Sequence, residues 1–272
     1  MEKKQGRGRE KIKILLNFAP SKQTDKKMWT IFRKEVSSFF TSLIGYITIF
    51  VFLVVNGLCL WIIDSDVNVF SSAIASLDGL FIISPIVFLF LISAVTMRTF
   101  AEEKRSGTIE ILLTRPVSDI SIIMGKFLAS LVIVVLSVLP TMIYMICVYQ
   151  LGSPVGNLDI GSILGSYIGL IFLGGIFVSI GVFCSSLTKN QIVAFILSVI
   201  VCLIVYDGFH ILATIPFLSK ANLLIESIGI SYHYNSISRG VIDLRDIVYF
   251  VSATAFFILS TKVSLESRNW KK

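Results

Sequence analysis

The residue types that most often carry out chemistry are few in this sequence and stand far apart. The four cysteines lie within or beside long apolar runs and form no C-x-x-C pair, which favours small packing residues over disulfides or metal ligands. The two histidines lack the three or four ligands that a stable metal site needs. We therefore expect no metal site among Cys59, Cys147, Cys184, Cys202, His210 and His233.

Motifs for hydrolysis or nucleotide binding are also missing. The sequence contains no G-x-S-x-G, no H-E-x-x-H and no G-x-x-x-x-G-K-[ST] phosphate loop. Its Gly125-Lys126 pair is followed by Phe127, and position 120 is Ile. We expect a chain that is not an enzyme and holds no cofactor, so any ATP and Mg²⁺ would be bound by a partner.

Composition indicates the class of protein. Of 272 residues, 55% are hydrophobic and only 15% are charged, and the mean hydropathy is +0.85. A soluble domain with this composition would have too few polar residues to cover its apolar surface, so we expect the lipid bilayer as a partner. The net charge of +7 does not indicate nucleic acid, because the basic residues flank apolar runs.

The apolar runs predict an all-α polytopic membrane protein. Several approach the roughly 20 residues that a spanning helix needs, and none alternates like a lipid-facing strand. The six predicted spans are residues 44–63, 80–97, 127–149, 163–184, 192–212 and 247–261.

Positive charge predicts the orientation of these spans. Of the 24 Lys and Arg residues, Lys220, Arg239 and Arg245 fall on one side of the spans and the other 21 fall on the opposite side. Positive residues favour the cytosolic side, so we expect both termini in the cytosol.

Two segments precede the first span. Residues 1–27 are basic and predict a disordered tail, whereas residues 28–272 would form the membrane domain. From Met28 to Phe40, apolar residues recur every three or four positions, which predicts an amphipathic helix in the membrane interface. A frayed start of the first span remains the alternative. The interfacial residues are Trp29, Phe32, Val36 and Phe39.

A charged segment, residues 98–126, separates the second and third spans. Arg98 and Glu102 stand one helical turn apart and are candidates to pair. Gly107 predicts a helix end, and Thr108 could cap a new short helix. Its apolar face would either fold back on the membrane or bind another protein; this face is formed by Ile109, Leu112 and Leu113, with Glu110 pointing elsewhere.

Small residues recur in the fourth span, at Gly161, Gly165 and Gly169. Such a stripe allows close helix approach. It predicts either packing within the chain or a dimer contact.

Two stretches resemble a known family. The first stretch, residues 100–126, resembles the loop between the second and third spans of ABC-2 type permeases, the membrane subunits of ABC transporters; it reads FAEEKRSGTIEILLTRPVSDISIIMGK. The second stretch, residues 236–250, resembles the segment before the last span of these permeases and reads SISRGVIDLRDIVYF. The sequence is most similar to the gliding-motility-associated permease of Bacteroidetes, and it is also similar to nitrous oxide reductase maturation permeases.

The resemblance implies how the chain would contact its ATPase. The loop would carry a coupling helix that binds the ATPase through Thr108, Ile109, Glu110, Leu112 and Leu113. A second cytosolic contact would be formed by Leu187, Thr188 and Lys189. Residues 213–245 would form short outer helices, in which Arg239 and Asp243, four apart on a helix, are candidates to pair.

The implied function is that of a permease subunit in a bacterial inner membrane. It would form a homodimer, or a heterodimer with a second permease such as one with a periplasmic domain, and couple ATP hydrolysis by the partner to export or conformational work. The alternative is a non-transporting scaffold or force-transmitting subunit of a motility or secretion machine. No residue in the sequence identifies a substrate.

Overall fold

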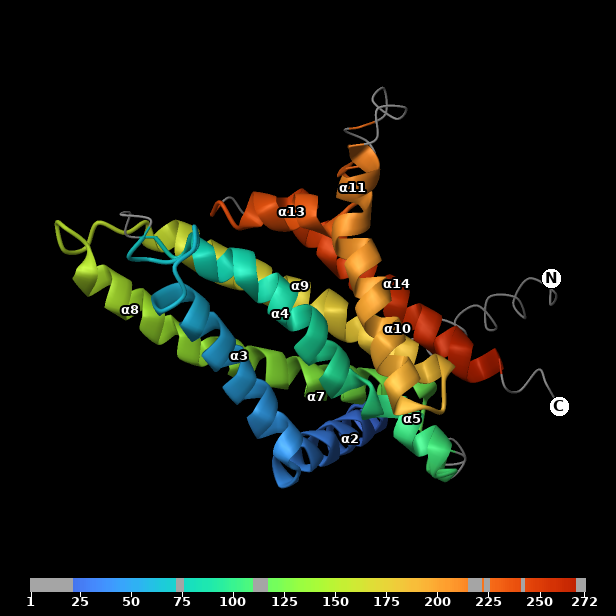
Figure 1. The fold of residues 1–272 in the computed structure, drawn as a ribbon. Helices are drawn as coiled ribbons and strands as arrows, with labels where there is room; N and C mark the ends of the chain where they lie inside the picture. The colour runs from blue at the N-terminus through green and yellow to red at the C-terminus, as the bar shows by residue number, and fades with distance from the viewer. Residues whose placement is uncertain are drawn as a thin grey trace, which may run out of the picture.

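Every regular element in the described part of the chain is a helix, which confirms the predicted fold class. The computed structural model describes residues 22–71, 76–109, 117–214, 222, 226–240 and 243–267. Figure 1 shows the helices, which are α2 (Lys22–Thr41), α3 (Leu43–Trp61), α4 (Asp78–Thr96), α5 (Arg98–Arg105), α7 (Asp119–Val138), η1 (Leu139–Thr141), α8 (Met142–Leu151), α9 (Ile160–Leu187), α10 (Gln191–Leu203), η2 (Ile204–Gly208), α11 (Phe209–Ala213), α13 (Ile230–Ile237) and α14 (Leu244–Glu266).

Among the described residues, six helical stretches are long and apolar enough to cross a membrane. They are Leu43–Trp61, Asp78–Arg105, Asp119–Leu151, Ile160–Leu187, Gln191–Ala213 and Leu244–Glu266. Each overlaps one predicted span, and several extend beyond it because polar caps begin the helix before the apolar run. Asp243, for example, accepts a hydrogen bond from the backbone N–H of Arg245 at 3.0 Å and begins the last helix.

Helix α9 lies at the centre of the bundle and packs against α4, α7, α10 and α14. Its glycines make these approaches possible. A Cβ atom on Gly174 would lie 2.6 Å from Cγ1 of Val134 in α7, and one on Gly169 would lie 2.7 Å from Cγ2 of Ile237 in α13. Gly169, a member of the small-residue stripe, and Gly174 therefore form packing contacts within the chain.

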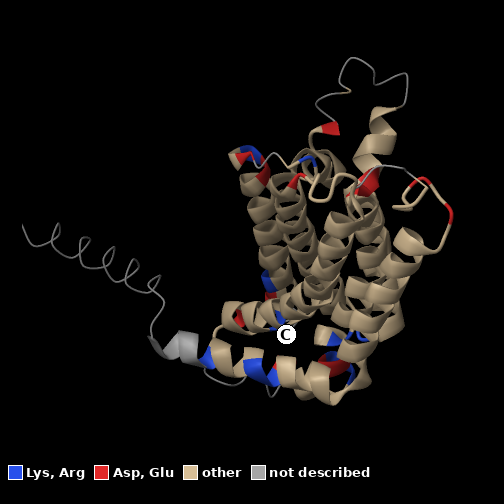
Figure 2. Cartoon of the chain, turned by 90° about the vertical axis from the view of Figure 1, so that its left-hand side faces the viewer, with Lys and Arg blue, Asp and Glu red and all other residues tan. Residues whose placement is uncertain are grey.

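Helix α2 lies across one end of the bundle, which we call the α2 end (Figures 1 and 2). It packs on the first turns of α7, where a Cβ atom on Gly125 would lie 3.0 Å from Cγ2 of Ile31. The helix begins at Lys22, so it includes residues 22–27 of the predicted tail. Apolar periodicity could not reveal this turn, because its residues are polar. The rest of the tail, residues 1–21, lies outside the described residues.

The opposite end of the bundle carries α13, a short helix between the last two spans as predicted. Its Tyr234 hydroxyl donates a hydrogen bond to the carbonyl of Phe81 at 2.8 Å, and burial raises the pKa of this phenol well above its usual value. On the same helix, Nδ1 of His233 lies 2.7 Å from Oδ1 of Asp246 in α14. These contacts attach α13 to α4 and α14.

Candidate functional site

A lysine is buried where α2, α5 and α7 meet. The side chain of Lys126 is only 2% exposed, although it belongs to the second turn of α7. Removing an ammonium group from water is costly unless it is paired and hydrogen-bonded. The surroundings of Lys126 must therefore supply acceptors.

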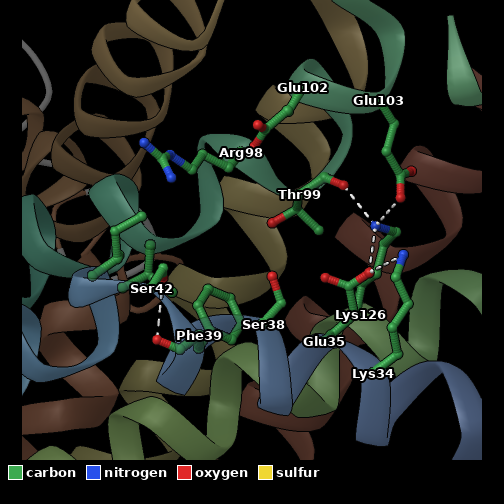
Figure 3. Close-up of a pocket in the computed structure, with 12 residues that line it drawn as sticks. Lys34, Glu35, Ser38, Phe39, Ser42, Arg98, Thr99, Glu102, Glu103 and Lys126 are labelled. Atoms are coloured by element: carbon green, nitrogen blue, oxygen red, sulfur yellow. Dashed lines mark hydrogen bonds and ion pairs between the residues drawn. The ribbon is translucent and has the colours of Figure 1, made fainter. Parts of the chain in front are cut away.

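Three acceptors surround the ammonium group (Figure 3). Nζ of Lys126 lies 2.8 Å from Oε1 of Glu103, 2.8 Å from the carbonyl oxygen of Thr99 and 3.1 Å from Oε1 of Glu35. A lysine ammonium has three N–H donors, so each donor has one acceptor. The ring of Phe100 adds a cation–π contact, with its centroid 5.1 Å from Nζ. We call Lys126, Glu35, Thr99 and Glu103 the Lys126 cluster.

The cluster depends on the register of three helices. Thr99 and Glu103 stand four residues apart on α5, so they share the face that meets α7. Glu35 reaches the same point from α2, which lies across the bundle end. Because every N–H donor of Lys126 is used, the cluster is suited to hold these helices together and unsuited to proton transfer or nucleophilic attack.

Helix α9 is joined to the same region by Ser185. Its hydroxyl lies 3.0 Å from the backbone N–H groups of both Phe100 and Ala101, and it lies 2.9 Å from the carbonyl of Met97. These groups sit where α4 continues into α5. The hydroxyl therefore supplies hydrogen-bond partners to backbone groups at this junction, and it ties the junction to α9.

The loop after α5 begins as predicted. Gly107 has a φ of 73°, the left-handed conformation that ends many helices at glycine. Thr108 is exposed, whereas Ile109 is only 3% exposed and packs within this chain. The remaining predicted contacts, Glu110, Leu112 and Leu113, lie outside the described residues.

The turn between α9 and α10 lies beside α5. Leu187 and Lys189 are exposed there, and Thr188 ends α9 with extended backbone. Nζ of Lys104 in α5 donates a hydrogen bond to the carbonyl of Ser186, just before the turn. The structure thus brings the second predicted contact next to α5, the helix that leads into the loop after Gly107.

The predicted interfacial residues lie on α2. Trp29 is exposed and stacks on Phe32, with ring centroids 4.9 Å apart. Val36 and Phe39 are half-buried against the bundle end. The amphipathic pattern is therefore real, but the polar face also supplies Glu35 to a buried cluster.

The predicted pairing of Arg239 with Asp243 assumed that both lie on one helix, and this was wrong. α13 ends at Ile237, Arg239 lies in the turn that follows it, and Asp243 caps α14. Gly240 between them has a φ of 83°. Within the described residues, no ion pair joins Arg239 to Asp243.

No pattern in the sequence predicted the Lys126 cluster. Lys126 was interpreted only as a basic loop residue and as part of an incomplete phosphate-loop motif. The available signal was the position of Lys126 between buried apolar neighbours, Ile122, Ile123 and Phe127. A cation there requires an anion from another helix, but the sequence could not show which one.

The fold and the cluster together define a multi-pass α-helical membrane protein whose interfacial helix is tied to its spans. Comparison with protein families identifies the group. The sequence model of the ABC-2 family transporter protein matches residues 29–263. The chain therefore belongs to the ABC-2 family and is a permease subunit of an ABC transporter, a class that works with an ABC ATPase. No individual curated protein matches the sequence.

Proposed function

We propose that the chain transmits movements of its ATPase partner from the α2 end of the bundle into the spans. The observation that carries this proposal is the Lys126 cluster, which ties α2 and α7 to α5. Because α5 leads directly into the loop after Gly107, a displacement of that loop would be passed to α4 and α7 together. The second and third spans would then move with the interfacial helix.

The distribution of charge supports an ATPase at this end. The excess of Lys and Arg predicts a cytosolic α2 end, with both termini in the cytosol of a bacterial inner membrane. The ATPase, with its ATP and Mg²⁺, would bind the coupling helix through Thr108, Ile109, Glu110, Leu112 and Leu113. It would also bind the turn formed by Leu187, Thr188 and Lys189.

Docking can be tested by co-purification with the ATPase. Replacing Leu112→Asp and Leu113→Asp together should abolish retention of the ATPase, because charge would replace the apolar contact. Asn235→Asp, an exposed position at the α13 end, is the control and should retain it. Full retention by the double variant would contradict the docking proposal.

Transmission can be tested in the same complex. A cysteine placed at exposed Asn235 should react with a maleimide at a rate that ATP changes. Lys126→Met should keep the ATPase bound but remove this ATP-dependent change, because the cluster no longer links the helices. An unaltered response in that variant would contradict transmission through the cluster.

We also propose that the permease works as a dimer and performs export or conformational work, in gliding motility or secretion. The support is the resemblance of residues 100–126 and 236–250 to the gliding-associated permease. Co-purification of a second permease with a periplasmic domain would favour a heterodimer of this kind. ATP hydrolysis by reconstituted vesicles without flux of any candidate solute would favour the force-transmitting alternative.

A further inference from the structure

A pocket of about 280 Å³ lies beside the Lys126 cluster, between α2, α5 and the adjoining ends of α3 and α4 (Figure 3). One part of its wall is apolar and is formed by Phe39, Ile44 and Val95. The other part is charged and includes Lys34, Arg98 and Glu102. The pocket therefore offers two kinds of surface to one occupant.

Its position matches the boundary between hydrocarbon and lipid headgroups. Ile44 is in the first turn of the spanning helix α3, and Val95 is in the last turn of α4. Arg98 and Glu102 follow on α5, where the apolar run has ended. An occupant with an apolar tail and a polar head would meet matching surface at both places.

Two opposite charges at the rim have no ionic partner among the described residues. Lys34 and Lys126 both lie within ion-pair distance of Glu35. Arg98 and Glu102 are exposed, and neither forms an ion pair within the described part of the chain. The pairing expected from their spacing is therefore not formed.

Two buried atoms in the pocket wall also lack hydrogen-bond partners among the described residues. Thr99 is 7% exposed, and no described residue pairs with its hydroxyl oxygen. Oε2 of Glu103 is likewise buried without a partner in the described part of the chain, while Oε1 binds Lys126. Figure 3 shows Thr99 on α5 facing Ser38 on α2 across the pocket. A carboxylate oxygen in this position requires a hydrogen-bond donor.

We infer that this pocket binds the phosphoethanolamine headgroup of a membrane phospholipid. The phosphate would bind the Arg98 guanidinium, and the ammonium group would donate to the Glu102 carboxylate. The two-carbon linker of this headgroup holds its two charges close together, as a pair of side chains four residues apart on one helix requires. The acyl chains would lie against Phe39 and Val95. Phosphocholine has no N–H donor, and phosphoglycerol has no cation for the carboxylate.

The test is native mass spectrometry of the full chain in detergent, with phosphatidylethanolamine, phosphatidylcholine and phosphatidylglycerol of identical acyl chains. Phosphatidylethanolamine should bind about tenfold more tightly than the other two, since one charge-assisted contact is worth about that factor. Arg98→Gln and Glu102→Gln should each lower its binding by about tenfold. Arg245→Gln, an exposed position on α14, should not change it.

The substitutions at Arg98 and Glu102 alter exposed side chains, so unchanged thermal unfolding should show that both variants fold. Equal binding of the three lipids would show a solvent-filled crevice only and overturn the inference. Phosphatidylethanolamine binding that neither substitution changes would overturn it as well. Soluble phosphoethanolamine that binds as tightly as the lipid would also overturn it. The assay contains no ATPase, so its outcome is independent of the proposed transmission.

Discussion

Nζ of Lys126 in α7 lies 2.8 Å from Oε1 of Glu103 in α5, although the two residues are separated by the whole charged loop. Glu35 completes the arrangement from α2, 91 residues before Lys126 in the sequence. A single buried cation thus holds the interfacial helix to the ends of two spans.

Removing the cation should destabilise the bundle. Lys126→Met leaves Glu35 and Glu103 close together without their counter-ion, and breaking a buried pair in this way costs about 3 kcal/mol or more. The measurement is the unfolding transition of the purified chain in detergent. Lys262→Met is the matched control, because its pair with Glu266 is only partly buried and should change the free energy of unfolding by less than about 1 kcal/mol. Equal losses in both variants would contradict a special role for Lys126.

The two carboxylates should substitute for one another in part. Glu35→Gln and Glu103→Gln each leave one anion on Lys126, so each should destabilise the chain modestly. The double variant leaves a buried ammonium without a counter-ion, and its loss should exceed the sum of the single losses by about 1 kcal/mol or more. A double-mutant cycle on the unfolding free energy measures this coupling. Strict additivity would show that the carboxylates act independently.

Adjacent glycines in α9 should differ in tolerance to alanine. A Cβ atom on Gly174 would lie 2.6 Å from Cγ1 of Val134, whereas one on Gly175 would meet its nearest neighbour only at 4.0 Å. Gly174→Ala should therefore cost about 1–3 kcal/mol through overpacking. Gly175→Ala should be neutral or stabilising, because alanine favours the helix. Thermal unfolding of the two variants compares them directly, and similar values would contradict the close contact.

His233 in α13 should contribute more to the stability of α13 than His210 in α11. Nδ1 of His233 lies 2.7 Å from Oδ1 of buried Asp246, and Nε2 lies 2.9 Å from the carbonyl of Ser227. His233→Phe keeps an aromatic ring for stacking on Tyr249 but leaves the carboxylate without its donor, at a cost of about 2 kcal/mol. Faster hydrogen exchange in residues 230–237 would report the loosened helix. His210→Phe, at an exposed position, should leave exchange there unchanged.

Local sequence signals predicted the elements that depend on nearby residues. The apolar runs predicted the six spanning helices, Gly107 predicted the end of α5, and the spacing of Phe32 and Val36 predicted the amphipathic α2. Each of these is a property of a short stretch, because helix ends and apolar faces arise from residues within a few turns. The spacing of Arg239 and Asp243 predicted an ion pair on one helix, but a turn that contains Gly240 separates the two residues.

The sequence by itself determined that this chain is a multi-pass helical membrane protein, because its apolar runs cannot be covered by water-exposed polar surface. Only the tertiary structure decided what its charges do. Lys126 could have been one more basic loop residue, and Arg98 and Glu102 could have paired as their spacing allows. The packing of α2 across the bundle end instead buries Lys126 between Glu35 and Glu103 and leaves Arg98 and Glu102 apart at a pocket. A buried charge selects its partners through three-dimensional proximity, which no local pattern in the sequence records.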